Sequence, residues 1–322
     1  MKPKTFETSF EKLNAAYNSV FAPGRLSIGL VVPIESYPDG PVPSMNEHLE
    51  RVQLAEELGF SSVWLRDVPF NVPSFGDAGQ LFDPFVYLGA LAAQTHRIGL
   101  GVASIILPLR HPAHVAKAAA SVDALSGGRL LLGIASGDRP EEYPALATSF
   151  EDRGKAFRES YAYIRKIADN RPSFESAYGR VAGGIDMLPK PTAQRIPLLV
   201  TGSSRQEIDW IATNGDGWMT YPRHRNFQVS IIEQLRMRTE AAGQPNKPVM
   251  EPLYIDLLPD ADAPPAPIHL GLRAGINALR DYLRARKYIG VNHIALNLRF
   301  NRHDTESTLK TLANGLFSEF SS

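Results

Sequence analysis

The sequence of 322 residues contains no cysteine. Disulfide bonds, thiolate catalysis and cysteine-based zinc or iron–sulfur sites are therefore excluded. A metal site of histidines and carboxylates is not excluded, but we find no candidate and predict no metal. The chain also has no excess of charge of either sign, because its 34 Lys and Arg residues balance its 34 Asp and Glu residues. No global charge directs the chain to nucleic acid or to an acidic membrane, and we expect neither as a partner.

Long hydrophobic runs are missing as well. No stretch of about 18 uninterrupted apolar residues occurs, so we predict no transmembrane helix. The N-terminal residues lack the apolar core of roughly 7–15 residues that a signal peptide requires. We interpret residues 1–21 as a short N-terminal extension with helical character, outside the main fold. The expected location of the protein is the cytoplasm.

Strand-like apolar runs alternate with helical stretches along the rest of the chain. This alternation is typical of βαβ units and a parallel sheet. The predicted strands are residues 26–32, 62–65, 98–103, 129–134, 197–201, 217–220, 251–257 and 292–296. Residues 171–195, rich in glycine and proline, form a hairpin-like insertion before the fifth strand. Eight such units over residues 22–322 predict one α/β domain, a (β/α)8 TIM barrel.

An open, doubly wound sheet is the structural alternative to the barrel. That fold would place a glycine fingerprint, G-x-G-x-x-G, directly after the first strand. The sequence after the first strand is PIESYPDGPVP, which contains no such motif. The closed barrel is therefore the favoured architecture.

Reacting groups of such barrels lie at the C-terminal ends of the strands. The turn TGSSRQE, residues 201–207, follows the fifth strand. Gly202 allows the backbone to approach a ligand closely, and Ser203 and Ser204 stand at the expected start of a helix, where free N–H groups attract anions. The turn is a candidate phosphate site. Its alternative role is a plain helix N-cap.

Three sequence segments indicate a family. They are AEELGFSSVWLRD, LGVASIILPLRHPAHVAKAAASVDALSGGRLLLGIASG and PLLVTGSSRQEIDWIATNGDGW, in this order along the chain. Together they strongly resemble the bacterial luciferase-like monooxygenase family, and the resemblance extends over roughly residues 26–320. It implies a TIM barrel with an insertion before strand five and a flavin ring at the barrel mouth.

The resemblance also implies the cofactor. Members of the family use reduced FMN, which a separate NAD(P)H:flavin reductase supplies, or the deazaflavin F420. We expect an FMN-dependent monooxygenase that acts with O2 on an unidentified small organic substrate. The alternatives are an F420-dependent hydride-transfer oxidoreductase and a non-catalytic flavin-binding relative. Dimers are common in the family, so a homodimer is expected.

Residue-by-residue transfer names candidate cofactor contacts. Two of them match the end of strand three, where the family often has a non-proline cis peptide under the flavin ring. Two match the end of strand four, beside the ring and phosphate, and the others surround the phosphate. In this order the candidates are Ala103 and Ser104; Ala135 and Ser136; and Gly202, Ser203, Ser204 and Gln206.

Two positions depart from bacterial luciferase. Ser136 stands where that enzyme has an arginine for the phosphate, and Asp67 stands where it has a catalytic histidine. Asp67 is our catalytic candidate, because an aspartate can accept a proton or orient a substrate. Its alternative role is a strand-end cap or a salt bridge with Arg66. Luciferase-type light chemistry is not expected.

Several basic side chains after strands three, six and eight are candidates for substrate contacts. They are His111, Arg223, His224, Arg225 and Arg299. The alternative for His111 is a helix cap. The alternative for the YPRHR segment, residues 221–225, is a solvated loop. We predict structural roles for Asp123 and Arg129, as an ion pair that fixes a turn, and a core position for Trp218.

Overall fold

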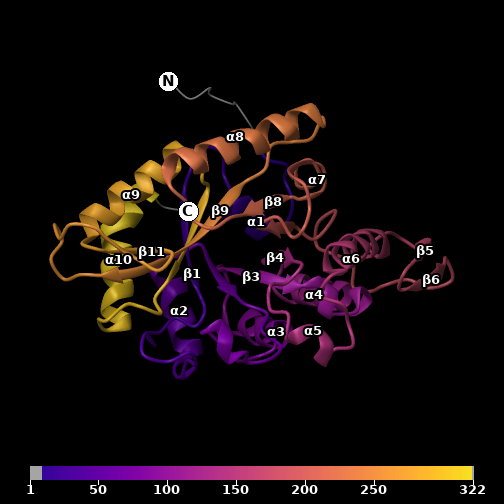
Figure 1. Cartoon of the computed structure of the whole chain (residues 1–322), viewed down its shortest axis with the longest axis horizontal. Coiled ribbons are helices and arrows are strands. Elements are labelled where there is room, and N and C mark those ends of the chain that lie inside the picture. The colour runs from indigo at the N-terminus through magenta and orange to yellow at the C-terminus, as the bar shows by residue number, and fades with distance from the viewer. Residues whose placement is uncertain (1–8, 321–322) are drawn as a thin grey trace.

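The computed structural model describes residues 9–320 of the chain. Its centre is a closed barrel of eight parallel strands, with helices around it (Figure 1). Each strand pairs with the next, and the last pairs with the first, which confirms the predicted TIM barrel. The strands are β1 (Ser27–Val31), β2 (Ser62–Leu65), β3 (Gly99–Ile106), β4 (Leu130–Ala135), β7 (Leu198–Thr201), β8 (Gly217–Met219), β9 (Val249–Leu257) and β12 (His293–Asn297).

Helices follow the strands as predicted. They are α2 (His48–Leu58), α3 (Pro84–Gln94), α4 (Pro112–Leu125), α6 (Arg153–Ile167), α7 (Ile208–Asn214), α8 (Arg225–Ala241), α9 (Ile276–Tyr288) and α10 (Thr305–Phe320). Proline at the first position fits both α3 and α4, because the missing N–H would have no helical partner there. Asp83 caps α3 by accepting from the amides of Phe85 and Val86 at 2.9 and 3.1 Å.

Helix α2 begins at His48, and the Ser44 hydroxyl before it donates to Glu35. A later helix begins farther along the chain than predicted. The helix expected from Ser204 begins at Ile208. Residues 202–207 are therefore a turn that precedes the helix, a difference that matters for the phosphate site.

The N-terminal segment belongs to the fold. Its short helix α1 (Ala15–Val20) is buried against the inward-facing barrel residues, including Trp64, Leu131 and Met219. The Ala16 amide donates to the Gly128 carbonyl, which precedes β4, so α1 closes the N-terminal end of the barrel. The predicted helical character is confirmed. The predicted place outside the main fold is wrong for residues 13–21, because their apolar side chains complete the core; residues 1–8 lie outside the described part.

The insertion before the fifth barrel strand contains a hairpin of β5 (Ser173–Ser176) and β6 (Gly179–Ala182). It projects beyond α6 at the right of Figure 1. The predicted insertion is therefore present. A second hairpin consists of β10 (Ala266–Ile268) and β11 (Gly271–Ala274), and β11 is paired to β9. Short helical turns are η1 (Pro73–Phe75), η2 (Leu107–Leu109) and α5 (Glu142–Ala145).

Buried polar groups connect the barrel to its surroundings. His293 accepts at Nε2 from the Trp64 indole at 2.8 Å, and its Nδ1 lies 2.7 Å from the Ser27 hydroxyl. Burial lowers the pKa of His293 to about 3, so the ring is neutral. Asp123 and Arg129 are both buried but do not pair. Asp123 accepts from Asn14 and Thr192, whereas Arg129 donates to backbone carbonyls and to Thr95.

The predicted ion pair between Asp123 and Arg129 is therefore wrong, and the reason is geometric. Asp123 faces α1 and the insertion, and Arg129 faces the end of α3. Trp218 is buried, as predicted for a core residue, and its indole donates to the Gly202 carbonyl at 2.8 Å. No helix within residues 9–320 is long and apolar enough to cross a membrane.

Candidate active site

A cavity of about 350 Å³, here called the mouth cavity, lies at the C-terminal ends of the strands. Eight predicted site residues line it: Asp67, Ala103, Ser104, Ala135, Ser136, Gly202, Ser203 and Ser204. These residues come from the ends of four strands and from the segments that follow them. The barrel thus brings together the positions that the sequence suggested for the cofactor.

A smaller space of about 80 Å³, the inner cavity, lies deeper in the barrel. It shares Arg66, Ala103, Thr201 and Tyr221 with the mouth cavity. Most of its lining is apolar, and its other residues are Val31, Trp64, Met219, Thr220, Met250, Pro252, Tyr254, Leu270, Ala295 and Asn297. The site therefore combines a polar outer part with an apolar inner part.

The end of β3 borders both parts, because Ala103 lines both cavities. The peptide bond between Ala103 and Ser104 is cis, as expected from the family resemblance. The buried Ser104 hydroxyl is hydrogen-bonded to the Thr201 hydroxyl on β7, and Thr201 also contacts the Met219 sulfur at 3.0 Å. Ser104 is therefore anchored to the neighbouring barrel strands.

The turn after β7 has an unusual backbone. Gly202, Ser204 and Arg205 all have positive φ angles of 55°, 48° and 61°. The Ser204 hydroxyl donates to the Thr201 carbonyl at 2.7 Å, and this bond supports the turn. Within residues 9–320, the amides of Ser203 and Ser204 have no hydrogen-bond acceptor. Such a turn of free backbone amides can bind an anion without a helix terminus.

Gln206 supports this turn from behind. Its side-chain amide donates to the carbonyls of Gly154 and Ser204, both at 2.9 Å. Gln206 does not line the mouth cavity. Its side-chain amide joins the turn to the start of α6, and its cofactor contact stays a prediction.

Sequence reasoning missed the arginines of the mouth cavity. Arg66, Arg139, Arg153 and Arg205 all line it. Arg153 is the first residue of α6, and the next residue, Gly154, accepts from Gln206. The Arg153 guanidinium lies 3.6 Å from the Phe150 ring centre, and its buried Nε has no hydrogen-bond partner in the described chain.

Arg153 and Arg205 are cations in the wall of the cavity that Ser136 also lines. Ser136 is buried, and its carbonyl accepts from the Tyr143 hydroxyl. No motif marks Arg153, which is 17 residues beyond Ser136 in the sequence. Only the packing of α6 beside the turn after β7 shows that a cation lies near the predicted phosphate site.

Asp67 is held by an ion pair. Its Oδ2 accepts from Arg110 Nε at 2.9 Å, and its Oδ1 accepts from Arg110 Nη2 at 2.7 Å. The Ile106 amide also donates to Oδ2 at 3.1 Å, and the Asp67 side chain is 1% exposed. Both oxygens are thus engaged, which favours a positioning role over proton transfer. Its partner is Arg110, whereas Arg66, the partner in its alternative role, pairs with Asp77 at 2.9 Å.

The predicted substrate contacts lie outside both cavities. His111 caps α4 by accepting from the Ala113 amide at 3.2 Å, which is its alternative role. Arg223, His224 and Arg225 are exposed at the start of α8. Arg299 pairs with Asp77 at 3.0 Å and donates to the carbonyls of Gly40 and Gly76. The structure therefore places these five side chains in caps, exposed loops and loop contacts, while Tyr221 from the same YPRHR segment lines the site.

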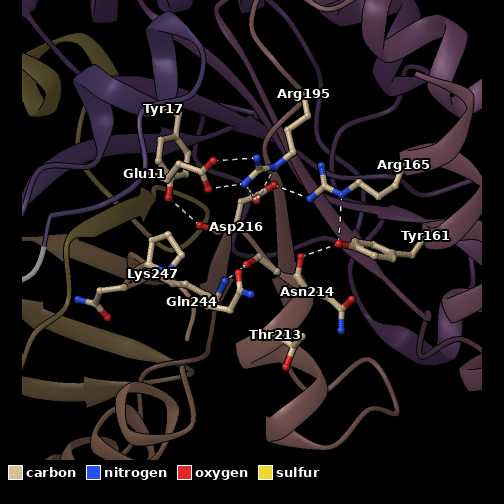
Figure 2. Close-up of a pocket in the computed structure, with 13 residues that line it drawn as sticks. Glu11, Tyr17, Tyr161, Arg165, Arg195, Thr213, Asn214, Asp216, Gln244 and Lys247 are labelled. Atoms are coloured by element: carbon tan, nitrogen blue, oxygen red, sulfur yellow. Dashed lines mark hydrogen bonds and ion pairs between the residues drawn. The ribbon is translucent and has the colours of Figure 1, made fainter. Parts of the chain in front are cut away.

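Another cavity, of about 330 Å³, lies at the opposite, N-terminal end of the barrel (Figure 2). Arg165 and Arg195 approach Asp216 from two sides there, and Arg195 also pairs with Glu11. Burial lowers the pKa of Lys247 in this cavity to about 8. The arginines are already bound to carboxylates, and this end of a TIM barrel serves stability. We therefore place the active site at the mouth.

The family model for luciferase-like monooxygenases matches residues 20–257. The chain belongs to the luciferase-like monooxygenase family. An uncharacterized protein of Mycobacterium tuberculosis is 30% identical to this member over 65% of this chain and 79% of its own length. The F420-dependent hydroxymycolic acid dehydrogenase of the same organism is 28% identical, over 69% of this chain and 60% of that protein.

Solved structures agree with the fold. A monooxygenase of Streptomyces bottropensis superposes with a TM-score of 0.76 at 21% identity, over 92% of this chain and 100% of the other. The luciferase-like family includes FMN monooxygenases and F420-dependent oxidoreductases. Membership therefore supports an oxidoreductase, and the choice of cofactor needs a further argument from the site.

Proposed function

We propose that this luciferase-like protein is an FMN-dependent monooxygenase whose cofactor binds in the mouth cavity. The observation that carries the proposal is the convergence of eight predicted cofactor and catalytic positions on one cavity with a polar, arginine-containing outer part and an apolar inner part. FMN has the matching polarity, with a phosphate at one end and a flat ring at the other. Reduced FMN, which a separate reductase would supply, brings the chemistry that activates O2.

The residues present fit this cofactor. The free amides of Ser203 and Ser204 and the unpartnered Nε of Arg153 are donors suited to a phosphate. The Ala103–Ser104 segment lines the mouth cavity, reaches the inner cavity at Ala103 and would lie against the ring. A volume of about 350 Å³ is at the lower end of small-molecule sites. A cofactor of the size of FMN would fill such a cavity.

The protein's own contribution is to orient the reactants and exclude water. The inner cavity would hold the substrate among apolar side chains, with Tyr254 and Asn297 as polar contacts. Its one charged lining residue, Arg66, is already paired with Asp77. Such a site suits a small uncharged organic substrate, because no unpaired charge is left for an ionic group to neutralise.

F420-dependent hydride transfer is the second candidate. Two observations favour it: the similarity to an F420-dependent dehydrogenase and the four arginines in the mouth cavity, more than one phosphate requires. Titration of the protein with FMN and with F420, followed by fluorescence, separates the candidates. Tight binding of F420 without binding of FMN would overturn the first proposal.

We expect the Arg153→Ala variant to bind FMN about tenfold to a hundredfold more weakly, because a hydrogen bond to a charged phosphate is lost. Its affinity for riboflavin, which has no phosphate, should not change. Dissociation constants from flavin fluorescence test this difference. Arg158→Ala is the matched control, since Arg158 is an exposed arginine on the same helix. Equal losses for FMN and riboflavin would place the phosphate elsewhere.

Oxygenase activity needs its own measurement. A flavin reductase, NADH and FMN are supplied together, and O2 consumption is followed with candidate substrates. Product that contains an atom of 18O2 would support the monooxygenase. Flavin binding without coupled product from any substrate would favour the non-catalytic relative.

A further inference from the structure

Two charged side chains of the mouth cavity have no role in the phosphate site. Arg139 and Glu142 follow β4, in the segment that leads into α5, and both line the cavity. They are almost fully buried, with exposed fractions of 7% for Arg139 and 2% for Glu142. Buried charges of this kind are rarely left without partners, since their desolvation is costly.

One atom on each side chain nevertheless lacks a partner. Arg139 Nη1 and Glu142 Oε1 are 3.9 Å apart, which is too far for a hydrogen bond. Neither atom has another hydrogen-bond partner within the described residues. They are thus a donor and an acceptor, side by side, in a cavity wall.

The surroundings keep the two groups apart. Arg139 donates through Nη2 to the Asp77 carbonyl at 3.1 Å, and its guanidinium lies 4.0 Å from the Phe75 ring centre. Burial raises the pKa of Glu142, and this effect exceeds the opposing influence of Arg139 and of the Phe70 amide. A ligand group that satisfies both orphaned atoms would stabilise this arrangement.

The chemistry of the pair restricts that group. An anion with acceptors only would face the Glu142 oxygen, and a cation with donors only would face Arg139. A neutral group with an N–H beside a carbonyl matches both atoms. The edge of the flavin ring is such a group, because its imide places N3–H between two carbonyls.

We propose that Arg139 and Glu142 bind the imide edge of the flavin ring. The N3–H group donates to Glu142 Oε1, and a neighbouring carbonyl accepts from Arg139 Nη1. This inference rests on the proposed binding of FMN in the mouth cavity. It gives Arg139 and Glu142 the task of orienting the ring, while the turn after β7 binds the phosphate at the other end of the cofactor.

The test compares FMN with 3-methyl-FMN, in which a methyl group replaces the N3 hydrogen. Dissociation constants from flavin fluorescence are measured for the wild-type protein and for three variants, Glu142→Ala, Glu142→Gln and Glu141→Ala. Methylation should weaken binding to the wild type about tenfold or more, because a hydrogen bond to a charged group is lost. In the Glu142→Ala variant, methylation at N3 should weaken flavin binding less than about threefold.

The two remaining variants sharpen the result. Glu142→Gln keeps a carbonyl oxygen as acceptor and should retain most of the preference for FMN. Glu141→Ala removes an exposed neighbouring carboxylate, which contacts Ser74 instead, and should behave as the wild type. An equal effect of methylation in the wild type and in Glu142→Ala overturns the inference. Failure of the wild type to bind either flavin overturns the proposed function instead.

Discussion

Replacing Asp216 by asparagine is expected to lower the free energy of unfolding by about 3–5 kcal/mol, because it removes the charge from a buried ion-pair network. Asp216 accepts from Arg165 at 2.5 Å, from Arg195 at 2.9 Å and from the Leu198 amide at 2.8 Å. The variant would leave two arginines near an uncharged amide at the N-terminal end of the barrel (Figure 2). Chemical denaturation of both proteins measures the difference.

The contribution of Asp216 to the free energy of unfolding should decrease as the pH falls. Burial by itself raises the pKa of Asp216, but Arg165 and Arg195 outweigh it and hold the pKa below its ordinary value. The stabilisation is therefore present above the pKa of the unfolded state and is lost as the pH falls through the lower folded-state pKa. The Asp216→Asn variant should not show this decrease in the free energy of unfolding, because asparagine has no carboxylate to protonate.

Two controls accompany the Asp216 variant. Asp169→Asn changes an exposed aspartate and should leave stability within about 0.5 kcal/mol of the wild type. Cofactor affinity of folded Asp216→Asn should be unchanged, since Asp216 lies at the end opposite the mouth cavity. If the free energy of unfolding of Asp216→Asn were less than about 1 kcal/mol below that of the wild type, the ion-pair network would contribute little net stability.

Replacing Glu251 by glutamine is expected to raise the free energy of unfolding relative to the wild type, and this difference should be larger at alkaline pH than at acidic pH. Glu251 on β9 is fully buried, and the buried Gln228 side chain on α8 is the polar group beside its carboxylate. Its nearest cation is Arg286 on α9, with Nε 3.5 Å from Oε2. Burial raises the pKa of Glu251 to about 7, although Arg286 opposes the shift.

The sign follows from linkage. A raised folded-state pKa means that the folded protein holds this proton more tightly than the unfolded chain does. The contribution is fully present below the unfolded pKa and is lost as the pH rises through about 7. Between pH 5 and pH 8 the wild type should therefore lose about 2–3 kcal/mol from this group, whereas glutamine has no proton to release.

Denaturation of the wild type and of Glu251→Gln at several pH values isolates this effect, because other titrating groups are common to both proteins. The difference between the two free energies of unfolding should grow as the pH rises. Glu240→Gln, an exposed carboxylate at the end of α8, is the control and should follow the wild type. Parallel curves for Glu251→Gln and the wild type would show that Glu251 is ionised throughout this range.

The fold was accessible from the sequence because its signals are local. Apolar runs such as residues 62–65 depend on a few neighbouring residues, and the structure reproduces this strand. The ordered family segments also located the ends of β3, β4 and β7, whose residues meet in the mouth cavity. Where local signals were ambiguous, as at Ser204, the predicted helix began too early.

Side-chain partners were not accessible in this way. Asp67 pairs with Arg110 rather than with its neighbour Arg66, and Asp123 faces Asn14 rather than Arg129. Of the five basic residues predicted at the substrate site, His111 and Arg299 make other contacts and the remaining three are exposed. Each of these outcomes depends on the direction in which a side chain leaves its strand or loop, and on packing that residues distant in the sequence provide.

The sequence by itself thus determined the closed barrel, the family and the segments that surround the candidate cofactor site, because strand periodicity and short motifs are encoded in contiguous residues. Only the tertiary structure decided that Arg153 stands beside the turn after β7, that Arg139 and Glu142 leave a donor and an acceptor unpaired, and that α1 closes the barrel. The physical reason is that hydrogen bonds and ion pairs require angstrom-scale placement, which the packing of separate βα units sets.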